Sequence, residues 1–354
     1  MPPGRKPAQP TISVIIPVYA VGEYLGACLD SVLGQAPDGL EVIAVDDASP
    51  DGSGRLLDAR SKEDPRLRVL HLADNAGPGN ARNVGLAEAS GEYVWFVDAD
   101  DLLAGGALAA VAARLGQDRP DVLLIDYEYL YPGGGTAPSP GAALLRAAPA
   151  GAFTLAEQPQ LIQLTMTSWS KVVRRAFLAG LGIAFPEGIH EDVPLTCAML
   201  LGAKRISALA RVCYRYRQAR PGAFMAARSS GQLRILAAYE RVFALAAATD
   251  PPPAPQVQAA LFERAIWHYT TVLPLVPRTA RRQYFRRMHD DFVRYRPAAY
   301  HRPRGARGVK FGLVERNAYG TYSVLEPANQ LRVLLARAGS RLAAASRGRG
   351  GRRA

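Results

Sequence analysis

Residues 91–101 read Gly-Glu-Tyr-Val-Trp-Phe-Val-Asp-Ala-Asp-Asp, an apolar run that ends in three carboxylates. The run Tyr-Val-Trp-Phe-Val is rich in β-branched and aromatic residues, which predicts a short buried strand. Asp98, Asp100 and Asp101 follow, and three negative charges are costly beside a buried strand unless a cation neutralises them. Carboxylate oxygens suit Mg²⁺ or Mn²⁺, and such ions usually also bind substrate phosphates. The stretch therefore predicts a divalent-metal site, with an Asp-rich turn or a helix N-cap as the alternative.

Strands alternate with helical segments around this stretch. Apolar runs predict strands at 12–17, 40–45, 67–70 and 122–129. Helical spacing predicts helices at 22–33, 51–59 and 102–115, and another from the Gly77-Pro78-Gly79 breaker to about residue 89. Such alternation indicates βαβ units. We therefore predict an α/β fold of Rossmann-like form, with a mainly parallel sheet flanked by helices.

The pattern changes beyond residue 130. Residues 131–152 are rich in Gly, Pro and Ala and are expected to form a mobile loop. A strand is predicted at 206–216, and helices at about 154–165, 171–181, 191–202, 230–248, 257–275 and 280–295. The low-complexity tail at 346–354 is expected to be disordered. We divide the chain into a first domain at 1–218, a helical basic region at 219–345 and this tail.

Charge is distributed unevenly along the 354 residues. Residues 1–200 hold 14 Lys and Arg against 24 Asp and Glu, whereas residues 201–354 hold 29 against 7. Such asymmetry predicts that the basic half faces an anionic partner. The candidates are acidic lipid headgroups, a phosphate-rich polymer and nucleic acid.

The cysteines and the N-terminus suggest where the protein works. Cys28, Cys197 and Cys213 lie far apart and fit neither a disulfide framework nor a zinc site, which favours a reducing cytoplasm. Neither a signal peptide nor an apolar run of spanning length is recognised. We therefore expect a cytoplasmic protein whose membrane contact, if any, is peripheral.

Polar residues follow three of the predicted strands. The segments are Pro17-Val18-Tyr19, Asp46-Asp47-Ala48-Ser49 and Asp98-Ala99-Asp100-Asp101. The carboxyl ends of parallel strands share one edge of a sheet, where ligands bind. A nucleotide fits such an edge, and Asp46 and Asp47 are the predicted contacts to a base N–H or a ribose hydroxyl. An Asx turn into the next helix is the alternative for this pair.

Three further motifs are weaker when taken alone. Gly79 and Arg82 open a helix, where glycine permits close backbone approach and the helix N-terminus favours an anion. Glu191 and Asp192 start another helix, an ordinary place for acids. The remaining candidates, for phosphate or acceptor-sugar contacts, are Trp169, Lys171, Arg215 and Arg217.

The ordered set of these motifs resembles the family 2 inverting glycosyltransferases with the GT-A fold. The segments that carry the resemblance are Ile12-Ser-Val-Ile-Ile-Pro-Val-Tyr19, Val45-Asp-Asp-Ala-Ser-Pro-Asp-Gly52, Gly77-Pro-Gly-Asn-Ala-Arg-Asn83, Asp98-Ala-Asp-Asp101 and Glu191-Asp192. One position departs mildly, because Ala48 stands where glycine is usual. Stand-alone enzymes of this kind resemble transferase modules linked with bacterial cell-surface polysaccharide or teichoic-acid assembly.

The resemblance implies a role for each motif. Asp98 and Asp100 match the metal-binding Asp-x-Asp, for Mn²⁺ or Mg²⁺, with Asp101 as an accessory acid. Asp192 matches the catalytic base, with Glu191 beside it, and Trp169 and Lys171 resemble a Trp-x-Lys element that precedes that base. Nucleotide-sugar contacts are expected from Pro17, Tyr19, Asp46, Asp47, Gly79, Arg82, Asp98 and Ala99.

The implied function is transfer of a sugar from a nucleotide-diphosphate sugar to a hydroxyl of a glycan, lipid-linked or phosphate-rich polymer acceptor. The alternatives are a polyanion-binding or nucleic-acid-binding protein without catalysis, and a sugar nucleotidyltransferase on a similar fold. A nucleic-acid partner is disfavoured because the basic half resembles no nucleic-acid module.

The basic half contains a predicted amphipathic helix. Its arginines cluster on one face: Arg281, Arg282, Arg286 and Arg287. Its predicted apolar face consists of Tyr284, Phe285, Met288, Phe292 and Val293. The arginine face is expected to dock on an anionic membrane surface.

Overall fold

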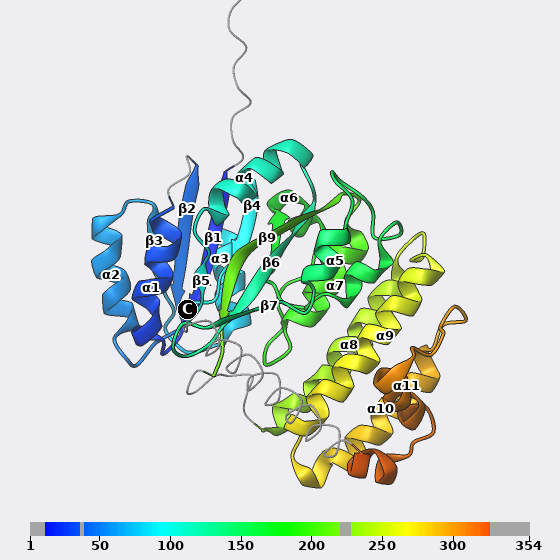
Figure 1. The fold of residues 1–354 in the computed structure, drawn as a ribbon. Helices are drawn as coiled ribbons and strands as arrows, with labels where there is room; N and C mark the ends of the chain where they lie inside the picture. The colour runs from blue at the N-terminus through cyan, green and yellow to red at the C-terminus, as the bar shows by residue number, and fades with distance from the viewer. Residues whose placement is uncertain (1–10, 36–38, 220–227, 326–354) are drawn as a thin grey trace, which may run out of the picture.

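A single mixed sheet forms the centre of the computed structural model, which describes residues 11–35, 39–219 and 228–325 (Figure 1). The strand order is β3-β2-β1-β4-β8-β6-β9-β5, and β7 pairs with β6. The strands are β1 (Ile12–Val18), β2 (Leu40–Asp46), β3 (Leu67–His71), β4 (Tyr93–Phe96), β5 (Leu102–Leu103), β6 (Val122–Leu130), β7 (Thr136–Pro138), β8 (Lys171–Arg174) and β9 (Ile206–Arg217).

The longer strand pairings are parallel, as the alternation of strands and helices predicts. Strand β1 pairs in parallel with β2 and β4, β2 with β3, and β6 with β9. The short strand β8 lies antiparallel between β4 and β6, and β5 and β7 add antiparallel pairs. The α/β class is therefore confirmed, with antiparallel strands joining two parallel groups.

Helices cover both faces of the sheet because its strands are apolar on both sides. Val14, Ile16 and Val18 of β1 belong to the core under one helical layer, whereas Ile15 belongs to the core of the other face. The first layer contains α1 (Gly22–Leu33), α2 (Ser53–Glu63) and α4 (Ala107–Asp118). The second contains α3 (Pro78–Glu88), α5 (Ala142–Ala147), α6 (Arg175–Gly180) and α7 (Asp192–Gly202).

The C-terminal helices extend from the second layer and appear in yellow and orange in Figure 1. They are α8 (Arg234–Ala248), α9 (Pro255–Val272), α10 (Arg281–Tyr295) and α11 (Gly305–Glu315). Short 3₁₀ turns accompany them: η1 (Pro159–Gln163), η3 (Ser230–Leu233), η4 (Leu273–Leu275) and η5 (Arg278–Ala280). No helix among these described residues is long and apolar enough to cross a bilayer.

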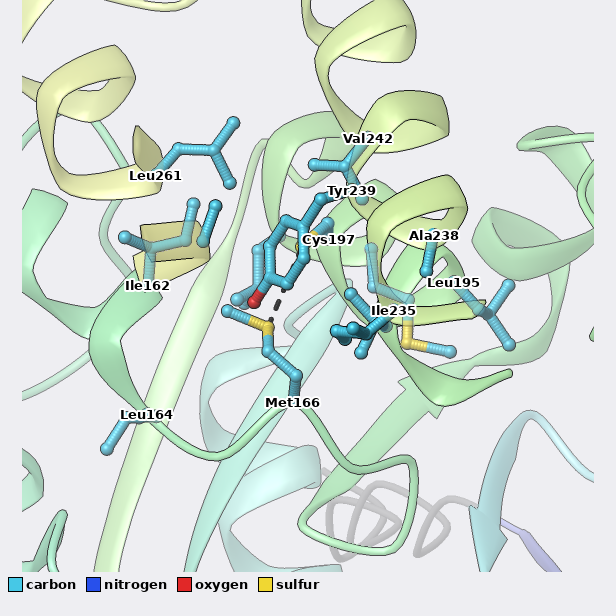
Figure 2. Close-up of a cluster of buried hydrophobic side chains, with 14 of the residues drawn as sticks. Ile162, Leu164, Met166, Leu195, Cys197, Ile235, Ala238, Tyr239, Val242 and Leu261 are labelled. Carbon is cyan, nitrogen blue, oxygen red and sulfur yellow. Dashed lines mark hydrogen bonds between the residues drawn. The ribbon is translucent and has the colours of Figure 1, made fainter. Parts of the chain in front are cut away.

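An apolar interface joins these helices to the second layer, and Figure 2 shows part of it. Cys197 of α7 lies against Met166, and Tyr239 of α8 lies beside them. The same buried cluster runs from Ile15 in β1 to Phe311 in α11. The hydrophobic core therefore continues across residue 218, where the sequence suggested a boundary.

Several predicted elements differ from the structure. The helix predicted at 154–165 is only the short turn η1, and the helix predicted at 171–181 begins as strand β8. Residues 131–152, predicted as a loop, contain β7 and α5, while 102–115 begins with β5 before α4. Helix α11 was not predicted. The long helices predicted at 230–248, 257–275 and 280–295 are confirmed, and the tail lies outside the described residues.

Candidate active site

The carboxyl ends of β1, β2 and β4 lie at one edge of the sheet, as the parallel pairing requires. The loops that follow β1 and β2 are hydrogen-bonded to each other. Asp51 Oδ2 accepts from Gly22 N at 2.8 Å, and Asp47 N donates to Val18 O at 2.9 Å. Ala48 has a φ of +57°, a left-handed conformation in which glycine is free of Cβ strain. This geometry accounts physically for the glycine that is usual at position 48.

Asp101 is the buried member of the aspartate cluster. Its two oxygens accept from Tyr214 Oη at 2.7 Å and from Arg217 N at 2.7 Å. Burial, reinforced by the charges of Asp100 and Asp98, raises the pKa of Asp101 well above its usual range. Tyr214 Oη also accepts from Asp98 N at 3.1 Å. Asp101 therefore fixes the turn that presents Asp98 and Asp100.

Asp98 and Asp100 are the members that solvent reaches. The Asp98 side chain is 26% exposed, and one of its oxygens accepts from Arg82 Nη2 at 2.7 Å. Burial raises the pKa of Cys28, and the negative charges of Asp101, Asp100 and Asp98 add to the rise. Nowhere in the described residues do three or more potential ligands gather. The two carboxylates supply the hard oxygen donors that a divalent ion such as Mg²⁺ or Mn²⁺ prefers.

Arg82 connects this cluster to the acidic pair at the start of α7. Its guanidinium donates to Asp98 Oδ1 at 2.7 Å and to Glu191 Oε1 at 2.8 Å, and lies 3.7 Å from Asp192 Oδ1. The Arg82 side chain is only 5% exposed, and its Nε has no hydrogen-bond partner in the described structure. The structure therefore brings Asp98, one of the two predicted metal ligands, and Asp192, the predicted base, into one network.

Burial shifts the ionisation of the acidic pair. It raises the pKa of both Glu191 and Asp192, and the Arg82 guanidinium opposes the rise in each case. Among the described residues, neither Asp192 Oδ1 nor the hydroxyl of Ser168 has a hydrogen-bond partner, and both atoms are buried. A carboxylate in such a setting is a stronger base than an exposed one.

Asp46 and Asp47 already have protein partners. Asp46 accepts from Ser49 N at 3.0 Å and lies 3.0 Å from Nδ1 of His71. Asp47 accepts from Ala76 N and Gly77 N at 2.9 and 2.8 Å, which ties β2 to the start of α3. Both are buried. The bond from Ser49 N to Asp46 is local, as the turn alternative expects, whereas the bonds of Asp47 reach residues 29 and 30 positions away. Both aspartates remain at the predicted edge, beside the exposed Tyr19 and the half-buried Pro17.

Gly79 has a packing role that the sequence did not predict. A Cβ there would lie 2.8 Å from Pro186 O and 3.3 Å from Glu191 Cγ. The missing side chain therefore lets α3 approach the segment that leads to Glu191. Ala99 is also buried, between the partly exposed Asp98 and Asp100.

Trp169 and Lys171 lie inside the protein rather than at a surface for acceptor or phosphate. Trp169 stacks on Tyr214 with ring centroids 4.5 Å apart, and its carbonyl accepts from Trp95 Nε1. The Lys171 ammonium donates to Thr165 O, Thr167 O and Ser170 Oγ, each at 2.9 Å. Burial lowers the pKa of Lys171 to about 7. Both residues thus support the turn between η1 and β8.

Arg215 and Arg217 differ in their relation to the site. Arg215 pairs with Glu128 at 2.8 Å, on the β6 strand. Arg217 Nε donates to Asp100 O at 2.7 Å, and its guanidinium lies over the Tyr24 ring. Arg217 is therefore the one of the two that belongs to the aspartate cluster.

Tyr214 and His190 are site residues whose importance the sequence did not reveal. Tyr214 occupies a buried position in β9, and only the alternation Tyr-Arg-Tyr-Arg hinted at its inward direction. His190 Nε2 donates to Gln232 Oε1 at 3.0 Å, across 42 residues of sequence. His190 is thus structural, and no local pattern identifies such a partner.

Comparison with known proteins adds an independent observation. Residues 13–176 match the family model described as Glycosyl transferase family 2. The chain is 37% identical over 116 residues to Glycosyltransferase GlyG of Streptococcus pneumoniae, covering 33% of this chain and 38% of that protein. It is 34% identical over 218 residues to Poly(ribitol-phosphate) beta-N-acetylglucosaminyltransferase TarS of Staphylococcus aureus, covering 60% of this chain and 36% of that protein.

A solved structure extends the likeness beyond the family model. The crystal structure of S. aureus TarS 1-349 in complex with UDP-GlcNAc matches with a TM-score of 0.73 at 26% identity, covering 90% of this chain and 91% of that chain. By contrast, the chain spans roughly one third to three fifths of the full length of the curated relatives it matches.

Proposed function

Because this chain belongs to glycosyl transferase family 2 and has the GT-A fold, we propose that it transfers a sugar from a nucleotide-diphosphate sugar to an acceptor hydroxyl. The observation that carries the proposal is the Arg82 network, in which Asp98 and Asp192 lie on either side of one guanidinium. A donor-binding carboxylate and a base are thereby held within one small site.

The proposed chemistry is a single displacement at the anomeric carbon. The acceptor oxygen bonds to that carbon as the bond to the diphosphate oxygen breaks. Asp192 takes the hydroxyl proton, and the electron pair of the broken bond leaves with the nucleoside diphosphate. The product has inverted anomeric configuration, and a positioned base contributes about 10²- to 10⁴-fold to the rate.

Asp98 and Asp100 would hold a divalent ion, Mn²⁺ or Mg²⁺, which when bound offsets the negative charge of the diphosphate. Asp100→Ala removes one predicted ligand, so titration calorimetry with nucleoside diphosphate and Mn²⁺ should show at least a tenfold weaker association. The control is Asp126→Ala. Asp126 lies in β6, and its buried carboxylate accepts from Ser139 Oγ. Equal affinity in Asp100→Ala and the wild type would remove Asp100 from the proposed site.

The acceptor is proposed to be a cell-surface glycan, a lipid-linked sugar or a phosphate-bearing polymer. The likeness to TarS supports a polymer acceptor and makes UDP-GlcNAc the first donor to test. Neither the family model nor these relatives supports the alternatives of polyanion binding without catalysis or nucleotidyl transfer.

The function is tested by a donor screen that follows nucleoside diphosphate release, with Asp192→Asn as the diagnostic variant. Its side chain cannot accept the proton, so kcat should fall by about 10²- to 10⁴-fold while nucleoside diphosphate still binds. Wild-type turnover by Asp192→Asn would reject Asp192 as the base and the site as described.

A further inference from the structure

Residues 185–192, here termed the base loop, carry Glu191 and Asp192 and are held on one side by α3. Asn83 Nδ2 donates to Phe185 O at 3.0 Å, and Phe185 N donates back to Asn83 Oδ1 at 3.0 Å. The Phe185 ring packs edge-on against Phe96 of β4 at 5.1 Å. This anchor fixes the beginning of the base loop to the sheet.

The C-terminal helical region holds the rest of the base loop. Arg234 Nη1 donates to Glu187 O at 2.9 Å, and His190 Nε2 donates to Gln232 Oε1 at 3.0 Å in a buried position. A Cβ on Gly231 would lie 3.2 Å from Ile189 Cδ1, so the two segments touch closely there. All of these partners come from η3 and the first residue of α8.

The backbone of the base loop needs such support. Gly188 has a φ of +93° and His190 a φ of +65°. A non-glycine residue with positive φ costs about 1–2 kcal/mol and persists when its surroundings hold it. A Cβ at Gly188 would collide with the Arg234 guanidinium. The strained turn immediately before Glu191 is therefore matched to the surface of η3 and α8.

The supporting surface is itself firmly packed. Ile235, Tyr239 and Val242 of α8 lie against α7 and the Met166 segment in the cluster of Figure 2. The His190 ring meets His268 of α9 edge-on at 5.7 Å, and Tyr239 Oη contacts His268 Nδ1 at 3.1 Å. Close packing of this kind restricts movement of the groups it carries.

We infer that Gln232 and Arg234 are positioning residues, which hold the base loop so that Asp192 faces the acceptor hydroxyl. The helical region thereby completes the active site, although it lies outside the residues that match the family model. The inference rests on the proposed role of Asp192 as the base.

Two variants test the inference in the full-length protein. Gln232→Leu removes the acceptor for His190, and Arg234→Met removes the donor to Glu187 while keeping an apolar stem. Displacement of the base by a fraction of an ångström should lower kcat by about 10- to 100-fold. The donor KM should stay within about twofold, because the hydrogen bonds of Gln232 and Arg234 described above are to His190 and Glu187 and not to the aspartate cluster. Arg234→Lys retains a donor and should recover most of kcat.

The matched control is Gln163→Leu. Gln163 Nε2 donates to Ala260 O at 2.6 Å and its Oε1 accepts from Arg307 at 2.8 Å. Gln163 is, like Gln232, a glutamine whose side chain links the C-terminal helical region to the residues before it. Neither of these two hydrogen bonds involves the base loop. Gln163→Leu should lower the melting temperature as much as Gln232→Leu without lowering kcat.

Wild-type kcat in folded Gln232→Leu and Arg234→Met would overturn the inference, and so would an equal loss of kcat in Gln163→Leu. If Gln232→Leu does not fold, the kcat of Arg234→Met decides the question, because Arg234 is exposed. The proposed function has a separate readout. Loss of turnover in Asp192→Asn, together with unchanged kcat in both positioning variants, would reject this inference alone.

Discussion

Arg82 contacts carboxylates from two distant parts of the chain, Asp98 after β4 and Glu191 before α7. Its pKa is raised because the charges of Asp192, Asp98 and Glu191 outweigh the effect of burial. Removing one partner from a buried ion network leaves uncompensated charge, which is strongly destabilising. The network therefore links the stability of the site to its chemistry.

Gly79→Ala tests the close approach of α3 to the base loop. A Cβ 2.8 Å from Pro186 O must displace the loop or the helix, so kcat should fall about tenfold or more. Overpacking should also lower the free energy of unfolding by about 1–3 kcal/mol. Steady-state kinetics and denaturant unfolding provide the two measurements.

Gly26→Ala is the control for this substitution. Gly26 lies within α1, and no atom would approach its added Cβ within 4 Å. Alanine favours the helix there by about 0.5–1 kcal/mol, so this variant should gain stability and keep its activity. An active, stable Gly79→Ala variant would show that the predicted collision is relieved without consequence.

The strand-end aspartates could be predicted from sequence because the direction of each strand determines where its last residues lie. Three longer-range pairings could not be predicted. Arg82 lies 109 residues from Glu191, Asp47 lies 29 and 30 residues from its two backbone donors, and His190 lies 42 residues from Gln232. The sequence indicated an anion at Arg82, whereas the structure places carboxylates of the chain itself there. The side-chain types were informative, and their pairing required the tertiary fold.

Strand β8 illustrates the corresponding limit for secondary structure. Lys171-Val-Val-Arg continues into a helical pattern, so the whole segment was predicted as a helix. The structure instead pairs it antiparallel with β4 and β6, where Val172 and Val173 are fully buried. The long amphipathic helices were predictable because their period repeats several times, whereas four residues carry too little periodicity.

Helix α10 contains a buried acid that gives a pH-dependent prediction. Burial raises the pKa of Asp291 to about 6, although Tyr269 Oη donates to it at 2.9 Å. Arg287 opposes the rise, and Glu240 and Asp290 add to it. The folded state therefore disfavours the ionised form. This penalty is absent below about pH 4 and fully present above about pH 6.

Asp291→Asn should remove the penalty and keep an acceptor for Tyr269. We expect stabilisation of about 1–2 kcal/mol above pH 6, after allowance for solvent screening, and none below pH 4. Thermal melting across this pH range measures it. Asp290→Asn makes the same charge change at an exposed neighbouring position and should show no such pH dependence. If the melting temperatures of Asp291→Asn and Asp290→Asn changed with pH in the same way, the buried carboxyl of Asp291 would not be the cause.

At the scale of the whole molecule, the basic half presents an arginine surface on α10. Arg282, Arg286 and Arg287 are exposed there, whereas Arg281 donates to Val276 O and Pro274 O. Tyr284, Phe285, Met288 and Phe292 form the buried face as predicted, but Val293 is 63% exposed and was wrongly assigned to it. We propose that this surface holds the protein on an anionic membrane.

Vesicle co-sedimentation tests this proposal. Each basic residue near an anionic leaflet contributes about 1 kcal/mol, so Arg282, Arg286 and Arg287 changed together to Ala should abolish most binding. Binding should need anionic lipid and weaken with salt. Replacing the exposed Arg119, Arg146 and Arg211 by Ala makes the same change in net charge elsewhere. Equal binding to neutral and anionic vesicles would defeat the proposal.

Two of the three tryptophans lie directly beneath the aspartate cluster. Trp95 donates to the Trp169 carbonyl, and Trp169 stacks on Tyr214, whose hydroxyl joins Asp98 N to Asp101. Indole emission is sensitive to nearby charge and to paramagnetic ions. The protein therefore contains an intrinsic optical probe at its donor edge, and unlabelled fluorescence titration can follow occupancy there in real time.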